Sequence, residues 1–315
     1  MRDTSSIVNM RDAVMAAIND LASEHSEIVM LDADLASCIG SASFCSVYPD
    51  RFYNCGIAEA NMIGVAAGLA SMGLVPYAHT FGCFASRRAY DQFFLSVGYT
   101  GQVVHVLGSD PGITAQYNGG THMPFEDIAL IRQIPGITII DPSDAQSCYE
   151  LVRQAYELNK SSYTRFARKG ASHRYPVGTK ITLGKGIELA QGEDVAIIAT
   201  GEVMVNAAEK AVEALAKKGI KATLVDLHTI RPLDYELISK VAKRCKRVLV
   251  CENGRYAGGV GEAVAGYLVQ NDPVPMDFVS VGEQFGEVGN LAYLAKVFGF
   301  TAANIEKKAE ALAKR

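Results

Sequence analysis

Apolar and polar residues alternate with two different periods along the first half of the chain. Between Asn9 and His25 the apolar residues recur every three or four positions, which is typical of a helix with one buried face. The next apolar stretch, Ile28–Asp32, is short and continuous, as in a strand buried inside a parallel sheet. The same alternation predicts further strands at 74–80, 103–107 and 137–140, and further helices at 58–72, 84–97, 125–133 and 144–158. This order predicts a parallel sheet with helices on both faces.

The pattern breaks between Arg168 and Glu193, where the chain is polar and rich in glycine, and it then starts again. Strands are predicted at 195–200, 222–226, 248–251 and 278–281, and helices at 205–218, 235–244, 260–269, 291–298 and 302–314. We therefore predict an α/β protein with two open, mostly parallel-sheet domains of three layers each. The first domain would cover residues 1–170 and the second residues 193–315, with a linker at 171–192.

Composition excludes several classes of function. The chain has 315 residues, of which 49% are hydrophobic and 20% charged, so both domains can bury a core and disorder is excluded. The formal charge of −4 argues against a nucleic-acid partner and against a basic surface for membrane binding. The seven cysteines include no CxxC pair, which favours reduced thiols over a zinc site. With no signal peptide and no apolar run of ~20 residues, the chain is expected to be cytoplasmic.

The sequence contains neither of two common phosphate-binding motifs. The chain has no GxxxxGK followed by Ser or Thr, which excludes a P-loop NTPase. The segment GGVGEAVAG, which begins at Gly258 after a predicted strand, is not a full GxGxxG motif. A tight turn between strand and helix explains it better than a dinucleotide site.

The segment with the most information is RFYNCGIAEANMIGVAAGLASMG at Arg51–Gly73, in which Glu59 begins a helix made largely of Ala, Gly, Met and Ile. It follows DADL (32–35) and precedes HTFGCFASRRAYDQ (79–92), YNGGTHMPFED (117–127) and PGITIIDPSD (135–144). In order and spacing this set resembles the pyrimidine-binding domain of the transketolase family of thiamine-diphosphate enzymes. In the second half, VAIIATGEVM, VDLHTIRPLD and VLVCENGRYAGGVGEAV are similar to the C-terminal domain of that family, so the resemblance covers essentially the whole chain.

The resemblance also implies a partner. Transketolases bind the diphosphate of the cofactor and its metal through a GDG motif and a later Asn, both in an N-terminal domain, and this chain contains no GDG. We therefore expect the C-terminal subunit of a split transketolase. A partner subunit of the N-terminal type would hold the diphosphate and Mg²⁺, and this chain would hold no metal. Because the cofactor would lie between the subunits, we expect an assembly with two copies of each chain.

Four residues are implied to contact thiamine diphosphate. A carboxylate bonded to N1′ of the pyrimidine makes the cofactor's own 4′-amino group a usable base, and Glu59 matches that carboxylate of the family. Judged alone, Glu59 would be an acidic residue at a helix N-terminus. Phe81 and Phe84 match the ring contacts, with Phe84 as the expected stacking partner, although Phe81 could also be a core residue. Asp34 in DADL matches a position near the thiazolium, but it could equally cap the following turn.

Five residues are implied to meet the substrate. His122 in GGTHMP matches a catalytic histidine that contacts the donor ketose. Arg11 and Arg168 match arginines that bind substrate phosphate, although either could form a surface ion pair instead. Asn118 stands where the family commonly has an Asp that contacts a substrate hydroxyl, and Ser109 stands in place of a phosphate-contacting His. Both departures lie in the substrate pocket, so the usual pentose phosphates are in doubt.

The resemblance thus implies a thiamine-diphosphate-dependent transketolase subunit that moves a two-carbon ketol unit between sugar phosphates and is active only with its partner. Two alternatives stay open. One is the β subunit of the E1 component of a 2-oxo acid dehydrogenase, which has the same two domains; THMPFED and the placement of the arginines favour transketolase. The other is a scaffold subunit without turnover, against which the joint presence of Glu59, Phe84 and His122 argues.

Overall fold

Six parallel strands form most of the larger sheet of the computed structural model, which describes residues 2–315. They are β1 (Ile28–Asp32), β2 (Phe52–Asn54), β3 (Val75–Phe81), β4 (His105–Ser109), β5 (Thr138–Ile140) and β6 (Ser162–Phe166). They lie in the order β5-β6-β4-β3-β1-β2. β1 is buried at every position, as its continuous apolar sequence predicts.

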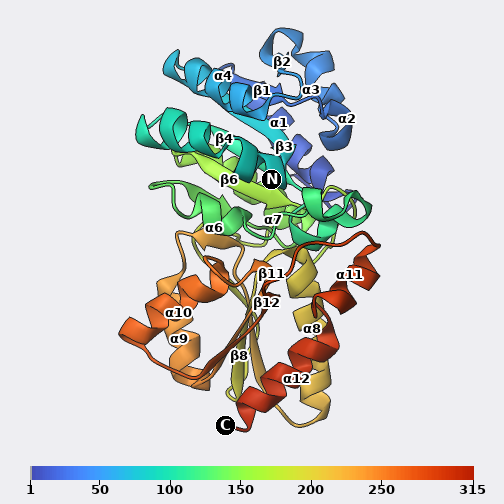
Figure 1. Ribbon diagram of the computed structural model, residues 1–315, viewed down its shortest axis with the longest axis vertical. Coiled ribbons are helices and arrows are strands. Elements are labelled where there is room, and N and C mark those ends of the chain that lie inside the picture. Colours follow the sequence, from blue (N-terminus) through green and yellow to red (C-terminus); the bar gives the residue numbers. More distant parts are fainter. Residues whose placement is uncertain (1) are drawn as a thin grey trace.

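Helices cover both faces of this sheet (Figure 1). The long helices α1 (Met10–Glu24) and α7 (Ala145–Glu157) share a core with Ile28 and Met30 on one face. The helix α4 (Glu59–Ser71) packs on the other face with Val29 and Leu31. Since successive side chains of a strand point to opposite faces, one short apolar run serves both layers.

Shorter turns connect these elements. They are α2 (Ala36–Ile39), α3 (Ala42–Val47), η1 (Pro49–Arg51), α5 (Tyr90–Gln92), η4 (Gly112–Asn118), η5 (Gly120–His122) and α6 (Asp127–Ile131). The helix predicted at 84–97 is irregular, because two π-helical stretches, η2 (Phe84–Arg88) and η3 (Phe93–Tyr99), flank α5. Such π-turns are rare and are often found at functional sites.

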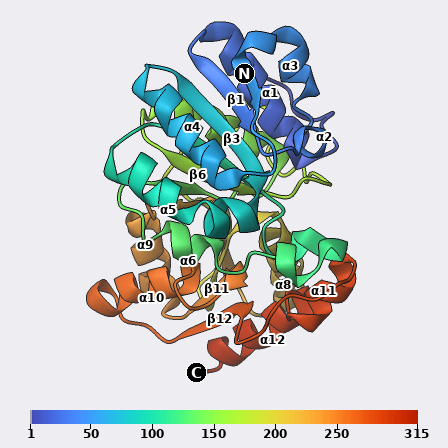
Figure 2. The same ribbon diagram turned by 45° about the horizontal axis from the view of Figure 1, so that its top comes forward.

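The second domain repeats the three-layer arrangement around a smaller sheet (Figure 2). Its strands are β7 (Ile187–Ala190), β8 (Val195–Ala199), β9 (Ala222–Asp226), β11 (Val248–Arg255) and β12 (Met276–Val281), in the order β12-β11-β8-β9-β7. One face is covered by α8 (Gly201–Lys217), α11 (Leu291–Val297) and α12 (Ala302–Ala313), and the other by α9 (Tyr235–Cys245) and α10 (Val260–Asn271). The prediction of an α/β protein with two mostly parallel sheets is confirmed.

The sequence does not predict two short strands, and one of them crosses from the second half of the chain to the first sheet. β10 (Thr229–Arg231) comes from the second half of the chain but pairs antiparallel with β5, at the edge of the first sheet. β7 lies inside the segment expected to be a linker and pairs antiparallel with β9 of the second sheet. Both are only three or four residues long, so neither carries a readable period of two.

A fully buried arginine joins the two domains in the interior. The guanidinium of Arg165, on β6, lies 3.0 Å from Asp127 and 3.3 Å from Asp141, and it donates to the main-chain oxygen of Asn253 at 3.0 Å. Thr200, from the second domain, donates to Asp141 at 2.9 Å. Burial raises the pKa of Asp141 to about 6, against the opposing charge of the arginine. We call Arg165, Asp127 and Asp141 the interior cluster.

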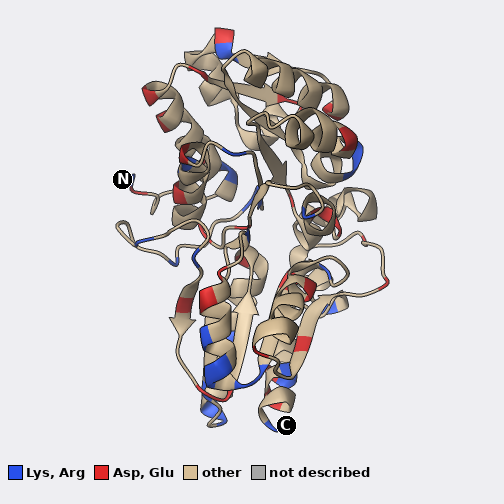
Figure 3. Ribbon diagram, turned by 90° about the vertical axis from the view of Figure 1, so that its left-hand side faces the viewer, with Lys and Arg blue, Asp and Glu red and all other residues tan. Residues whose placement is uncertain are grey.

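Charges on the rest of the chain are mixed. Figure 3 shows acidic and basic residues interspersed along both domains. In residues 2–315, no helix combines the length and the apolar character that crossing a membrane requires.

Candidate active site

Several predicted site residues follow the carboxyl ends of β1, β3, β4 and β6, which are neighbours in the larger sheet. Asp32 pairs in register with His79, Phe81 with Ser109, and Ser109 with Phe166. Parallel strands present their carboxyl ends at the same edge, and such edges commonly carry the binding sites of α/β proteins. The chain therefore collects polar and aromatic side chains from distant sequence segments at one place.

Glu59 is the first residue of α4 and is almost completely buried, with 1% of its surface exposed. One nitrogen of Arg88, Nη1, lies 3.0 Å from Oε1 and 2.9 Å from Oε2 of its carboxylate. About half of the Arg88 side chain (49%) is exposed. The guanidinium carbon of Arg88 also lies 4.1 Å from the centre of the Phe84 ring, a cation–π contact. A buried carboxylate is thus covered on its open side by one half-exposed cation.

Phe81, Phe84 and His122 form an aromatic cluster beside this carboxylate. The ring centres of Phe81 and Phe84 are 6.1 Å apart, and His122 contacts both edge-on, at 5.8 and 5.1 Å. The Nδ1 of His122 lies 2.9 Å from the hydroxyl of Thr121. Arg88, which contacts both Glu59 and the Phe84 ring, links the buried carboxylate to this cluster, so three separate segments of the chain meet here.

The consecutive arginines Arg87 and Arg88 diverge at the π-helical turn. Arg88 turns toward Glu59, whereas Arg87 donates to the main-chain oxygen of Thr121 at 2.8 Å and pairs with Glu126 at 3.2 Å. Arg87 therefore holds the loop that carries His122. The sequence does not reveal this difference, because the direction of each side chain depends on the π-helical turn of η2.

Arg168 contacts the aromatic cluster through Phe81. Its guanidinium carbon is 4.8 Å from the centre of the Phe81 ring, and its Nε donates to Asp110 at 2.6 Å. Asp110 also accepts from the main-chain N–H of Arg168 at 3.1 Å. Burial raises the pKa of the Asp110 carboxyl, and the charge of Arg168 opposes this. The pair fixes Arg168 next to the cluster.

The sequence gives no reason to single out Asp110. It follows β4 and Arg168 follows β6, and these strands are neighbours in the sheet. Knowing the strand order would have been enough to expect the contact.

Asp34 lies just beyond β1 and is exposed. Its φ of 62° places it in the left-handed region, which residues other than glycine seldom adopt. Asn54 supports this turn from both sides, because it accepts from the main-chain N–H of Asp34 at 3.1 Å and donates to the Asp34 carboxylate at 3.2 Å. The turn is therefore held in place with the carboxylate at the strand edge.

Ser109 has no exposed surface, which differs from the expectation of a substrate contact. Its hydroxyl lies 3.1 Å from Nε2 of His79, whose Nδ1 lies 2.8 Å from Asp32. The order Asp–His–Ser is that of a hydrolase triad, but all three side chains are fully buried, so no substrate can reach the hydroxyl. We interpret these residues as an internal support for the strand ends, and the buried position of Ser109 is set by its place inside β4.

Arg11 and Asn118 lie outside the aromatic cluster. Nη1 of Arg11 donates to the main-chain oxygens of Cys38 at 2.9 Å and of Ser37 at 3.4 Å. This nitrogen therefore holds the short helix α2, which follows Asp34. Asn118 is exposed at the end of η4 and lines a cleft between the domains.

The arrangement suits a planar ring that carries a basic nitrogen. A buried carboxylate can hold such a nitrogen, and two aromatic faces can contact the ring. Among residues 2–315, no group of three or more His, Cys, Asp or Glu side chains could hold a metal ion.

Comparison with known proteins agrees with this geometry. Residues 6–171 match the family described as transketolase, pyrimidine binding domain, and residues 184–305 match transketolase, C-terminal domain. The chain is 42% identical to the 6-deoxy-6-sulfo-D-fructose transketolase subunit SqwH of Clostridium sp. (strain MSTE9), over 97% of this chain and 95% of that protein.

One further relative and one solved structure also match this chain over nearly their whole length. The chain is 29% identical to a subunit of an apulose-4-phosphate transketolase from Phocaeicola vulgatus, over 97% of each chain. A solved structure described as a split gene transketolase, inactive beta4 tetramer, superposes with a TM-score of 0.91 at 33% identity, covering 98% of this chain and 99% of that chain. Taken with the two domains and the site at the strand ends, these matches establish that the chain belongs to the transketolase family.

Proposed function

We propose that this chain is the C-terminal subunit of a heteromeric, thiamine-diphosphate-dependent transketolase that transfers a two-carbon ketol unit between anionic sugars. The observation that carries the proposal is the buried carboxylate of Glu59, which begins α4 beside Phe81, Phe84 and His122. Membership of the transketolase family supports the same conclusion.

The residues fit the aminopyrimidine half of the cofactor. Glu59 would bond the ring nitrogen N1′, and Phe84 would contact the ring face, with Phe81 behind it. Thiamine diphosphate supplies a carbanion at the thiazolium C2, formed with the help of its own amino group. Arg88 now contacts both Glu59 and the face of Phe84, so its guanidinium must leave both when a ring binds there. Asp34, at the strand edge, would face the thiazolium.

The residues offer no counterpart for the diphosphate half. No metal-holding group lies in residues 2–315, and the sequence has no GDG motif. We infer that a separate subunit of the N-terminal type supplies the diphosphate site and Mg²⁺. The relatives described as transketolase subunits and as a split gene transketolase support a partner. Two copies of each chain would complete the active sites at their interfaces.

The substrate is proposed to be a ketose that carries a strong anion. His122 would contact the oxygens of the donor, and Arg168 would bind the anion with its planar guanidinium. Asn118 would face the sugar chain. The relatives are described as acting on a sulfonated and on a phosphorylated sugar, so either anion is a candidate. Arg11 stays a candidate for a second contact with the anion.

Reconstitution with the partner tests this function. The chain should be purified together with a GDG-bearing subunit of the N-terminal type from the same organism, supplied with thiamine diphosphate and Mg²⁺, and screened against phosphorylated and sulfonated ketose donors with aldose acceptors. We expect ketol transfer that needs both subunits and is lost with Glu59→Gln. Absence of transfer from every donor, with both subunits folded and associated, would favour the scaffold alternative. Decarboxylation of a 2-oxo acid, assayed with an added artificial electron acceptor such as ferricyanide, would favour the E1 alternative.

A further inference from the structure

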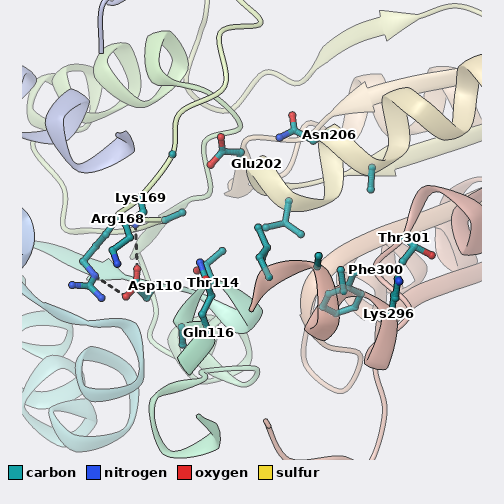
Figure 4. A pocket seen from close by; sticks show the side chains of 18 of the residues that line it. Asp110, Thr114, Gln116, Arg168, Lys169, Glu202, Asn206, Lys296, Phe300 and Thr301 are labelled. Atoms are coloured by element: carbon teal, nitrogen blue, oxygen red, sulfur yellow. Dashed lines mark hydrogen bonds and ion pairs between the residues drawn. The ribbon is translucent and has the colours of Figure 1, made fainter. Parts of the chain in front are cut away.

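A cleft of about 720 Å³ lies between the two domains (Figure 4). Its walls come from η4 and the segment after β6 in the first domain, and from α8, α11 and the start of α12 in the second. A space of this volume falls within the usual range of small-molecule sites, and the boundary between domains is a common place for them.

This cleft is separate from the aromatic cluster. Glu59, Phe81, Phe84 and His122 are absent from its walls, whereas Asp110 and Arg168 are part of them. The ion pair between these two residues therefore lies where the cleft borders the aromatic cluster, because Arg168 lines the cleft and also contacts the Phe81 ring. A ligand in the cleft would not occupy the place proposed for the cofactor ring.

The cleft is lined with unpaired positive charge. Lys169, Lys210 and Lys296 lie on its walls, and in residues 2–315 the lysines that form ion pairs are others. The two carboxylates of the lining are already engaged. Asp110 is held by Arg168, and Glu202 accepts from the main-chain N–H and the hydroxyl of Ser172, both at 2.7 Å. None of these three lysines thus forms an ion pair with a carboxylate in residues 2–315.

Apolar and amide groups line the space between these lysines. Val203, Leu291 and Phe300 contribute apolar surface, and Gln116 and Asn206 contribute amides. A simple inorganic ion would leave the apolar wall unused, and an uncharged apolar molecule would leave the lysines unpaired. The chemistry therefore favours a ligand with an anionic head and an apolar body.

We propose that this cleft binds a small organic phosphate or sulfonate, with its anionic group on Lys210 and Lys296 of the second domain and its apolar part against Leu291 and Phe300. The site gives the second domain a binding role of its own. Arg168 and Asn118, which are proposed to meet the ketose, line another part of the same cleft. The proposed transketolase activity uses none of the four residues that define this site, Lys210, Lys296, Leu291 and Phe300, so the two proposals can fail separately.

The absence of tryptophan from the chain allows a clean binding assay. Leu291 is 38% exposed and lines the cleft, so Leu291→Trp places the single indole of the protein in the cleft without opening the core. Its fluorescence should be titrated with phenyl phosphate and with benzenesulfonate, which distinguish the two anions, and with phenol as the uncharged match. We expect saturable changes with at least one anion, weakened by added salt, and none with phenol.

Charge reversal locates the binding. In the Leu291→Trp background, the pair Lys210→Glu and Lys296→Glu should weaken binding of the anion by roughly tenfold or more. The matched control is Lys217→Glu with Lys307→Glu, two exposed lysines of α8 and α12 that lie outside the cleft. The control should bind as the parent does, and circular dichroism should verify that both pairs fold.

Three results would overturn the proposal: no saturable response to either anion, equal binding by the cleft pair and the control pair, or equal responses to phenol and to the anions. The titration uses the full chain alone and needs neither cofactor nor partner. Failure of the transketolase assay and failure of this assay are therefore independent outcomes. Repeating the titration with the reconstituted pair should give the same order of affinities, and loss of binding there would contradict a role in the assembled protein.

Discussion

Two arginine–carboxylate groups in this chain use the same chemistry in opposite surroundings. In the interior cluster, Arg165 is fully buried and contacts two carboxylates and a main-chain oxygen from the other domain. At the candidate active site, Glu59 is buried, but its partner Arg88 is half exposed and lies on an aromatic ring. The first group is sealed on all sides, whereas the second is closed by a residue that water or a ligand can displace.

The difference separates a structural role from a functional one. A buried ion pair that loses one partner leaves an uncompensated charge, so the interior cluster cannot exchange its members. A pair that is open to solvent on one side contributes little to stability and can be replaced at small cost. Similar residue types therefore join the domains at one place and border the candidate active site at the other. Of five substitutions, those at Glu59, Arg165 and Arg88 test this difference directly, and those at Glu252 and Arg168 extend it to another buried carboxylate and to another arginine at the aromatic cluster. They are taken from the largest expected effect to the smallest.

Glu59→Gln should lower kcat of the reconstituted enzyme by a factor of about 10² to 10⁴, because the amide cannot exchange a proton with the pyrimidine nitrogen. The melting temperature should change little. Glu262→Gln is the matched control, since Glu262 is also an acidic residue in the first turn of a helix. If both variants kept equal activity, Glu59 would be no more than a residue that complements a helix dipole.

Arg165→Met should destabilise the folded chain by about 3–5 kcal/mol, because Asp127 and Asp141 would lose their common cation. Urea unfolding followed by circular dichroism measures the change. A loss below about 1 kcal/mol would mean that the interior cluster stabilises the fold no more than an exposed ion pair does. The proposed difference between this cluster and the Glu59–Arg88 pair would then be wrong.

Glu252 should make stability depend on pH. Its carboxylate accepts the N–H groups of Val260 and Gly261 at 2.8 and 2.9 Å, yet burial raises its pKa to about 7 from an ordinary value of 4.5. Between these values the folded chain holds a proton that the unfolded chain has released, so this contribution falls as the pH rises from about 5 to 7.

The size of this effect should be on the order of 1–3 kcal/mol. It is measured as the difference in unfolding free energy between the parent and Glu252→Gln at pH 5 and at pH 8. Parallel curves for the two proteins would show that the carboxyl is ionised throughout this range.

Arg168→Lys should raise the KM for an anionic ketose by roughly tenfold and change kcat less, because lysine keeps the charge but loses the planar fork. Lysine also leaves Asp110 with a cation nearby, which limits the effect on folding. Steady-state kinetics with the donor varied would measure both constants. An unchanged KM would mean that Arg168 only supports Phe81 and Asp110.

Arg88→Met should cost about 1 kcal/mol of stability or less, because water can reach the place that the guanidinium leaves. The urea assay used for Arg165→Met gives a direct comparison of the same substitution in two surroundings. A loss equal to that of Arg165→Met would mean that Arg88 is a structural residue and that Glu59 is not available to a ligand.

The sequence predicts the elements that are long or continuous. The helix expected at 9–25 is found at Met10–Glu24, and the strand expected at Ile28–Asp32 has those bounds. Some short strands are not predicted, because three or four residues are too few to show a period. β10 joins the sheet of the other domain, and its pairing partner lies about ninety residues away in the chain, at β5. The extra residue in η2 likewise changes side-chain directions without changing the hydrophobic pattern.

At the candidate site, too, the sequence predicts some features and not others. Family resemblance selects Glu59, Phe81, Phe84 and His122 as candidates, and in the structure Arg88 links Glu59 to the cluster of the three rings. The sequence could not show that Ser109 is buried under His79, because this depends on which strands are neighbours. For the same reason it could not show that Arg88 closes the site over Glu59.

The most direct test of the central claim is the exchange of the C2 proton of thiamine diphosphate with deuterium, followed by NMR in the reconstituted pair without substrate. If Glu59 activates the cofactor through its pyrimidine nitrogen, the parent should exchange this proton quickly, and Glu59→Gln should slow the exchange by about 10² or more while the cofactor stays bound. Equal exchange rates in the two proteins, at equal occupancy, would contradict the assignment of Glu59.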